Sequence, residues 1–381
     1  MRRYQRILSR LVSSLWAGAL SFHALAAFAV PDAPAPTTSA KVTRDLLYKK
    51  GGDPKLNVLD IYSPPGKTNC PVVIFIHGGG WQIGDKKSGS KGKAEAFPQQ
   101  GYVFISINYR LAPKVQHPAL VQDCAAAIAW VRNNVAAYGG DPSTLFVMGH
   151  SAGAHLAALV STDERYLQAE GLSLGNLKGV VLLDGGSYDM TGKGFKKPSK
   201  VEPITNAFGS DPAVWKAASP VYHIRPGKGI PPFEILYVSH RPDSKSQSEE
   251  LARALTGAKV RAEVKPAHNK THETLNKELG MPGDVPTQQV YAFFSGITGQ
   301  PVRPIAAAPG GLPDKATPSA AGKPRNGFQR LQALDLTAAQ KTQVRAILEK
   351  YQGDRRNPAF RKEIAQVLTP EQRGRYAGNQ P

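Results

Sequence analysis

The chain has few cysteines, few acidic residues and almost no long apolar runs. Its two cysteines, Cys70 and Cys124, are too few for a disulfide framework or a cysteine-based metal site. An oxidising compartment would allow one disulfide between them. We nevertheless expect two separate, small buried residues.

Acidic residues are outnumbered by basic ones, with 29 Asp and Glu against 48 Lys and Arg in 381 residues. The resulting formal net charge of +19 is large enough to attract nucleic acid or anionic membranes. However, the chain lacks the basic runs interleaved with aromatic residues that nucleic-acid binding would require. We therefore expect a diffusely basic protein with no nucleic-acid partner.

The one long apolar run lies at the N-terminus. Residues 1–10 carry four arginines and no acid, and residues 11–28 are largely apolar. Ala27 and Ala29 then form an A-x-A-like cleavage site. This order predicts a secretory signal peptide over residues 1–29. No later run reaches the roughly 18 apolar residues of a membrane span, so we expect a periplasmic or secreted protein without an integral membrane segment in the mature chain.

The rest of the chain divides by composition. Residues 30–41 are rich in Pro, Ala, Ser and Thr and predict a flexible leader, and the Pro/Ala/Gly-rich residues 301–327 predict a linker. Between them lies a large domain, residues 42–300, and after them a small helical segment, residues 328–381.

Short apolar runs alternate with helical stretches throughout the large domain. Several runs are apolar at every position or at all but one, which is typical of strands buried on both faces of a parallel sheet. They are Val72–Ile76, Val103–Ile107, Leu145–Met148, Val180–Leu183 and Ile235–Val238. Strand and helix in alternation predict an α/β fold with a doubly wound, mostly parallel sheet.

A glycine-flanked serine follows one of these strands. The segment Gly149–Gly153 reads Gly-His-Ser-Ala-Gly and stands between the strand ending at Met148 and a helical stretch beginning at Ala154. A sharp strand-to-helix turn leaves no room for side chains around the nucleophile, and glycines meet that need. We therefore predict Ser151 as a nucleophile at a helix N-terminus, where the dipole favours developing negative charge.

A second glycine run, His77-Gly-Gly-Gly-Trp81, follows the strand Val72–Ile76. Such a run lets backbone N–H groups point into a cavity, as an oxyanion hole requires. The run lacks the Lys-Ser/Thr ending of a phosphate-binding loop. We therefore predict Gly79 and Gly80 as oxyanion donors, with the N–H of Ala152 as a third.

A serine triad of this fold class has the order serine, acid, histidine. The acid should follow the strand Ile235–Val238, where Asp243 lies. Asp184 and Asp189, after the preceding strand, are its rivals. Two histidines, His268 and His272, follow the next strand and are the candidate bases.

Four segments occur in the order found in the carboxylesterase and hormone-sensitive-lipase-like group of α/β-hydrolases. They are His77–Trp81, Asn108–Pro113, Gly139–Pro142 and Gly149–Gly153. The chain most resembles the branch that contains bacterial carboxylesterases, feruloyl/acetyl xylan esterases and kynurenine formamidases. The resemblance spans about residues 42–298, with one departure: lipase-like members often have Asp at the position of His150.

The resemblance favours His272 as the base, because residues 272–280 are similar to the family's catalytic-histidine loop. It implies a triad of Ser151, Asp243 and His272 that forms an acyl-enzyme without metal or cofactor. It also implies that the insertion over residues 185–232 is a cap, whose aromatic residues either grip the substrate or form the cap's own core.

We accordingly predict a serine esterase acting on small or medium acyl or aryl esters, with a small-molecule ester as its partner. Hydrolysis of aryl formamides is the alternative activity, and a non-catalytic binding module is a third hypothesis. In the tail, Leu336–Gln340 and Leu368–Gln372 match capping boxes. They also resemble the LTxxQ motif of small periplasmic stress chaperones, and we assign this segment no function.

Overall fold

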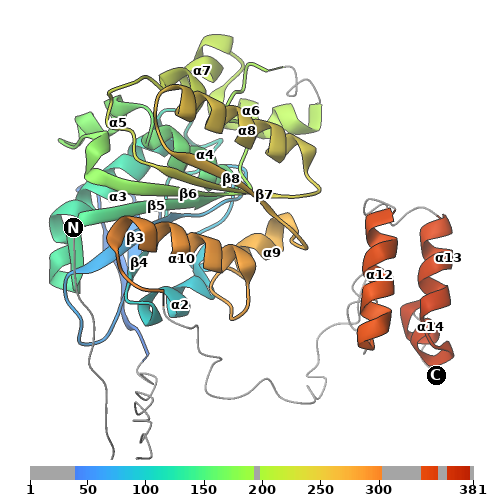
Figure 1. Cartoon of the computed structure of the whole chain (residues 1–381). Helices are drawn as coiled ribbons and strands as arrows, with labels where there is room; N and C mark the ends of the chain where they lie inside the picture. Colours follow the sequence, from blue (N-terminus) through green and yellow to red (C-terminus); the bar gives the residue numbers. More distant parts are fainter. Residues whose placement is uncertain (1–38, 193–197, 303–335, 351–357, 378–381) are drawn as a thin grey trace, which may run out of the picture. The chain divides into compact units, whose positions relative to one another are not determined.

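The computed structural model describes residues 39–192, 198–302, 336–350 and 358–377 (Figure 1). The expected signal peptide lies outside these residues, as do the leader up to residue 38 and the linker from residue 303.

A single eight-stranded sheet forms the centre of the large domain, with the strand order β1-β2-β4-β3-β5-β6-β7-β8. The two pairs that involve β2 are antiparallel, and the other five pairs are parallel. The strands are β1 (Lys41–Leu47), β2 (Val58–Ser63), β3 (Cys70–Ile76), β4 (Val103–Ile107), β5 (Gly140–His150), β6 (Leu177–Leu183), β7 (Phe233–Val238) and β8 (Ala262–Ala267). The predicted mostly parallel α/β sheet is therefore confirmed.

Helices cover both faces of this sheet. Figure 1 shows α3, α4 and α8 over one face and α2 and α10 over the other. The α-helices of this domain are α1 (Lys86–Ser90), α2 (Lys93–Gln99), α3 (Ala119–Asn134), α4 (Ala152–Val160), α5 (Glu164–Ala169), α6 (Pro198–Phe208), α7 (Pro212–Ala217), α8 (Pro242–Gly257), α9 (His272–Lys277) and α10 (Val285–Thr298). Short 3-10 helices are η1 (Val135–Tyr138), η2 (Leu174–Asn176) and η4 (Pro220–His223).

The core has two halves, because alternate residues of a strand point to opposite faces of the sheet. Ile74 and Ile105 pack on one face with Leu156 of α4. Phe146 packs on the other face against Phe294 of α10, with their ring centroids 4.4 Å apart. Both faces are buried, which explains why the strand runs are almost entirely apolar.

The parallel strands all end at one edge of the sheet. The loops after β3, β5, β6, β7 and β8 therefore meet there. In open α/β sheets, ligands bind at this carboxyl edge. These five loops begin at His77, Ser151, Asp184, Ser239 and His268.

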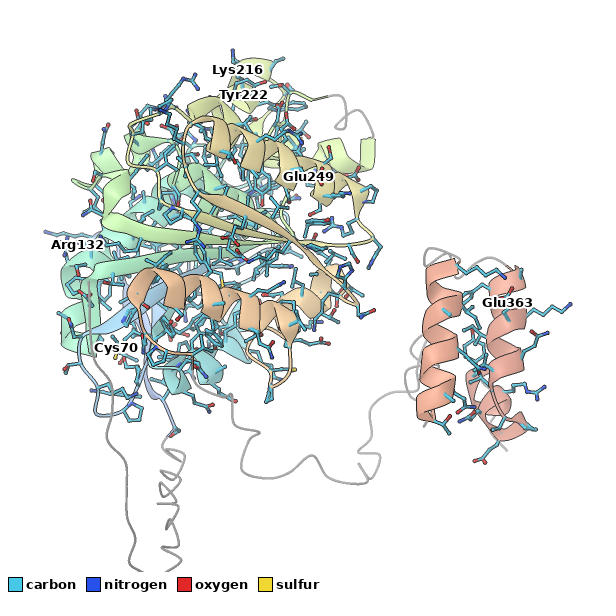
Figure 2. The ribbon with its side chains drawn as sticks, in the orientation of Figure 1. Cys70, Arg132, Lys216, Tyr222, Glu249 and Glu363 are labelled. Atoms are coloured by element: carbon cyan, nitrogen blue, oxygen red, sulfur yellow. The ribbon has the colours of Figure 1, made fainter. Side chains whose placement is uncertain are left out.

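The insertion over residues 185–232 contains α6, α7 and η4 and is part of the main core. Tyr188 and Phe208 are buried in the same cluster as α4. The Trp215 indole N–H donates to the Gly209 carbonyl at 2.7 Å. Lys216 covers Tyr222, with Nζ 5.3 Å from the ring centroid (Figure 2). The described aromatic residues of the insertion thus serve packing, either within the insertion or against the main core.

The C-terminal segment contains α12 (Ala338–Lys350), α13 (Pro358–Val367) and α14 (Pro370–Ala377). Its own small cluster includes the buried Phe360 and Ile364. Both predicted capping boxes are confirmed. In each, the threonine N–H donates to the glutamine Oε1 and the glutamine N–H donates to the threonine Oγ1, over 2.9–3.2 Å. The two glutamines also bond to each other, from Gln340 Nε2 to Gln372 Oε1 at 2.8 Å.

The two cysteines lie in different elements of the core. Cys70 begins β3 and Cys124 lies in α3, and both are buried thiols. Burial raises the pKa of the Cys124 thiol well above its usual value. Among the described helices, none has the length and apolar character needed to cross a membrane.

Candidate active site

Ser151 occupies the turn between β5 and α4, in a strained backbone conformation with φ +56° and ψ −122°. The turn is tight because neighbouring backbones approach closely. A Cβ on Gly149 would lie 2.2 Å from the Gly153 carbonyl oxygen, and one on Gly153 would lie 2.1 Å from that of Ile76. Only glycine fits at both positions. The Ser151 hydroxyl is therefore presented at the carboxyl edge of the sheet by a nucleophile elbow.

His272 is the histidine that reaches the serine. It is the first residue of α9, whose N-cap Thr271 forms a capping box with Thr274. His272 Nε2 lies 2.9 Å from Ser151 Oγ. His268, the other candidate, is exposed in the turn after β8.

The carboxylate that contacts His272 is that of Asp184, which directly follows β6. Its Oδ2 lies 2.6 Å from His272 Nδ1. The side chain is fully buried, and its Oδ1 accepts the Val238 N–H at 3.0 Å. Asp184 thus takes the place that the sequence analysis assigned to Asp243, and that prediction is corrected here.

The path of the chain after β7 explains the correction. The Arg241 guanidinium, not a carboxylate, reaches the triad from this loop and donates to Asp184 Oδ2. Asp243 lies in the first turn of α8 and lines the pocket beside the serine. Asp184 was already a rival in the sequence, because it ends a buried strand run next to the strand that carries the nucleophile. Its position directly after β6 is the sequence signal that favours it as the acid.

The environment of Asp184 keeps it ionised. Burial alone would raise the pKa of its carboxyl group. Hydrogen bonds from His272 and the Val238 N–H, with the charge of Arg241, outweigh burial and hold the pKa well below its usual value. A buried carboxylate on Nδ1 favours the histidine tautomer whose Nε2 can accept the serine proton.

The glycine loop after β3 lies beside the serine. Gly80 and Ala152 line the same pocket as Ser151. Ala152 is the first residue of α4, so its N–H has no acceptor within the helix. Gly79 has φ +118°, and a Cβ there would lie 2.0 Å from the Ile83 carbonyl oxygen. Gly80 and Ala152 thus lie beside Ser151, and the donor roles of Gly79, Gly80 and Ala152 remain predictions.

Two further histidines support this arrangement. The His150 Nε2 lies 2.8 Å from the His272 carbonyl oxygen. Burial, with the nearby His272 ring, lowers the pKa of His150 to about 3, so this ring is neutral and donates through Nε2. His77 stacks on Tyr109 with ring centroids 4.5 Å apart, and its Nδ1 lies 2.8 Å from the Gly78 carbonyl oxygen. The support that His150 gives to the base was not foreseen.

A pocket of about 650 Å³ opens over Ser151. The apolar part of its lining includes Trp81, Pro203 and Ile204. The polar part includes residues from the loop after β6 and from α8. These are Ser187, Asp189, Asp243, Ser246, Gln247 and Glu250. Within the part of the chain that is described, no three His, Cys, Asp or Glu side chains are grouped as a metal site would need.

Comparison with known proteins places this geometry in context. The chain is 34% identical to esterase LipQ of Mycobacterium tuberculosis over 231 residues, covering 58% of this chain and 54% of LipQ. It is 30% identical to a probable isoprenylcysteine alpha-carbonyl methylesterase, ICMEL2, of Arabidopsis thaliana, covering 62% of this chain and 58% of that protein. The chain thus spans a little over half the length of these curated relatives.

Solved structures show the same fold. Esterase B from Lactobacillus rhamnosis superposes with a TM-score of 0.58 at 23% identity, covering 69% of this chain and 87% of that one. The esterase Est2 from Thermogutta terrifontis superposes with a TM-score of 0.54 at 25% identity, covering 69% and 94%. The fold is therefore that of the α/β-hydrolases. Since the BD-FAE family model matches residues 59–255, more than half of the chain, the chain belongs to the BD-FAE family.

Proposed function

We propose that the chain is a serine carboxylesterase whose triad is Ser151, His272 and Asp184. The supporting observation is one continuous series of contacts, 2.9 Å from Ser151 Oγ to His272 Nε2 and 2.6 Å from His272 Nδ1 to Asp184 Oδ2. The names of the relatives, an esterase and a methylesterase, support the same reaction class.

In the proposed mechanism, His272 Nε2 takes the Ser151 proton as Oγ attacks the ester carbonyl. The carbonyl oxygen becomes an oxyanion, which the N–H groups of Gly80 and Ala152 stabilise. One such donor contributes roughly 10²–10³-fold in kcat. The imidazolium then gives its proton to the departing alcohol oxygen, which leaves an acyl-enzyme on Ser151. Water, deprotonated by His272, hydrolyses this intermediate and restores the serine.

The lining of the pocket suggests the kind of ester. Its apolar residues Trp81, Pro203 and Ile204 suit a short or medium acyl chain or an aryl group. The hydroxyl, amide and carboxylate groups of its polar residues suit an alcohol part that carries hydrogen-bond donors. We therefore propose small or medium esters of polar alcohols as substrates.

An activity-based probe tests the reaction class. A fluorescent alkyl phosphonate should label the wild-type protein at Ser151, and the Ser151→Ala variant should remain unlabelled. Hydrolysis of p-nitrophenyl acetate should exceed that of N-formylkynurenine, since the relatives are esterases. A folded wild-type protein that the probe does not label would refute the proposal, and faster turnover of the formamide would replace esters with amides.

We also propose that the protein is exported, on the basis of its arginine-rich and apolar N-terminal sequence. Mass spectrometry of the protein from its native host should find a mature chain beginning near Val30. A chain that retains residues 1–29 would contradict export by this route.

A further inference from the structure

The positively charged guanidinium of Arg241 lies against His272, the histidine of the proposed triad. It lies at the N-cap of α8, and its backbone is fixed by two hydrogen bonds, from its N–H to Val238 O at 2.9 Å and from Lys245 N–H to its carbonyl at 3.0 Å. The guanidinium Nη1 donates to Asp184 Oδ2 and lies 2.6 Å from His272 Nδ1. Asp184 Oδ2 therefore contacts two nitrogens, Arg241 Nη1 and His272 Nδ1.

These two nitrogens compete for that oxygen. A guanidinium has only donors, so a hydrogen bond from Arg241 Nη1 to His272 Nδ1, 2.6 Å away, needs Nδ1 as the acceptor, whereas the bond to Asp184 Oδ2 needs Nδ1 as the donor. Nδ1 accepts only when the proton is on Nε2, and Nε2 then cannot take the Ser151 proton. Asp184 favours the productive tautomer, which carries its proton on Nδ1. Arg241 favours the unproductive tautomer, and its positive charge also opposes formation of the imidazolium.

We propose that Arg241 is a positioning residue that acts through His272. It shares the Asp184 carboxylate with the imidazole and holds a fixed cation against Nδ1. In this way it opposes a positive charge on the imidazole and extends ester hydrolysis to lower pH. The inference rests on the proposed esterase function, because it assigns Arg241 a part in the same triad.

The other charged and titratable groups around His272 come from several elements. They are Asp184 and Asp189 after β6, His150 at the end of β5, Lys93 of α2 facing His150, Asp243 and Glu250 of α8, and Glu273 of α9. Arg241 is the cation that contacts the ring itself. Because the remaining groups are identical in an Arg241 variant, a comparison of variant and wild type isolates its contribution.

The test measures the acidic limb of the kcat/KM profile in Arg241→Gln, Arg241→Met and Arg241→Lys. Both neutral replacements should move the limb up by about one pH unit, because a like charge that disfavours the imidazolium is removed. At pH values below the wild-type midpoint, a shift of this size lowers kcat/KM roughly tenfold. Lysine should restore the wild-type limb. Arg253→Gln, on the exposed side of α8, removes an equal charge elsewhere and should leave the limb in place.

A purely structural role would lower kcat at every pH without moving the limb, and that outcome would overturn the proposal. An NMR titration of the His272 ring gives a readout that needs no substrate. A midpoint that rises in Arg241→Gln or Arg241→Met supports the inference even if the protein hydrolyses no ester, and an unchanged midpoint refutes it. Loss of esterase activity in Ser151→Ala tests the proposed function separately.

Discussion

At the scale of single residues, the group that contacts His272 Nδ1 determines which tautomer the imidazole adopts. Asp184→Asn keeps the shape of the side chain but can hold Nδ1 unprotonated, which leaves Nε2 unable to accept the serine proton. We expect kcat to fall on the order of 10³–10⁴-fold. Asp243→Asn replaces a charged residue of the pocket lining by a neutral one, and we expect its effect mainly in KM. Steady-state kinetics of both variants distinguish the two carboxylates, and equal losses of kcat would contradict the assignment.

The sequence identified Ser151 through a local pattern, because the elbow needs glycines at fixed distances from the nucleophile. It also identified His272, by resemblance. The acid could not be chosen in the same way. Asp184 and Asp243 follow adjacent parallel strands, and which one reaches the histidine depends on how two loops run through space. Arg241 takes the place after β7 that the general order of the fold assigns to a carboxylate.

At the scale of elements, the helices are held mainly by apolar packing against the sheet. Phe294 of α10 is fully buried and contacts Phe146 of β5 with centroids 4.4 Å apart. Phe294→Ala should lower the unfolding free energy by about 3–5 kcal/mol, because it leaves a cavity in a dense core. The exposed Val285 begins the same helix, and Val285→Ala should change stability by less than about 0.5 kcal/mol. Urea denaturation of both variants provides the comparison, and similar losses would argue against this core.

The central strands were predictable for the same reason. β3, β4, β6 and β7 are apolar runs buried on both faces, and their observed bounds differ from the predicted ones by at most three residues. β1 was not singled out, because Lys41–Leu47 is an edge strand with mostly exposed side chains. The role of the insertion's aromatic residues was left open, since apolar side chains that line a pocket and those that fill a core look alike in sequence.

At the scale of the whole molecule, buried bases make stability depend on pH. Burial lowers the pKa of His150 to about 3 and that of His155 to about 4. It lowers the pKa of Lys93 to about 7. Unfolding returns these groups to ordinary values near 6.5 and 10.4, so the unfolded chain binds more protons. Stability therefore rises with pH, between about 3 and 6.5 through the histidines and between about 7 and 10.4 through the lysine.

We accordingly expect the unfolding free energy to be larger at pH 9 than at pH 6. The high positive charge acts in the same direction, because self-repulsion weakens as histidines with ordinary pKa values lose protons above pH 6. Each buried base contributes up to about 1.4 kcal/mol per pH unit within its window. Urea unfolding across this range measures the trend, and Lys93→Met should flatten it above pH 7. A stability maximum near pH 6 would contradict the expectation.

The nucleophile elbow has a consequence for how this protein could evolve. Ser151 is held at φ +56° and ψ −122°, where a side chain costs about 1–3 kcal/mol. Ser151→Gly should relieve that strain and, after the entropy that glycine adds to the unfolded chain, raise stability by about 1 kcal/mol. Ser151→Ala retains the Cβ and should gain little, so thermal denaturation of the pair tests the origin of the effect. Without selection for turnover, the sequence would therefore drift toward a protein that is more stable but lacks the nucleophile.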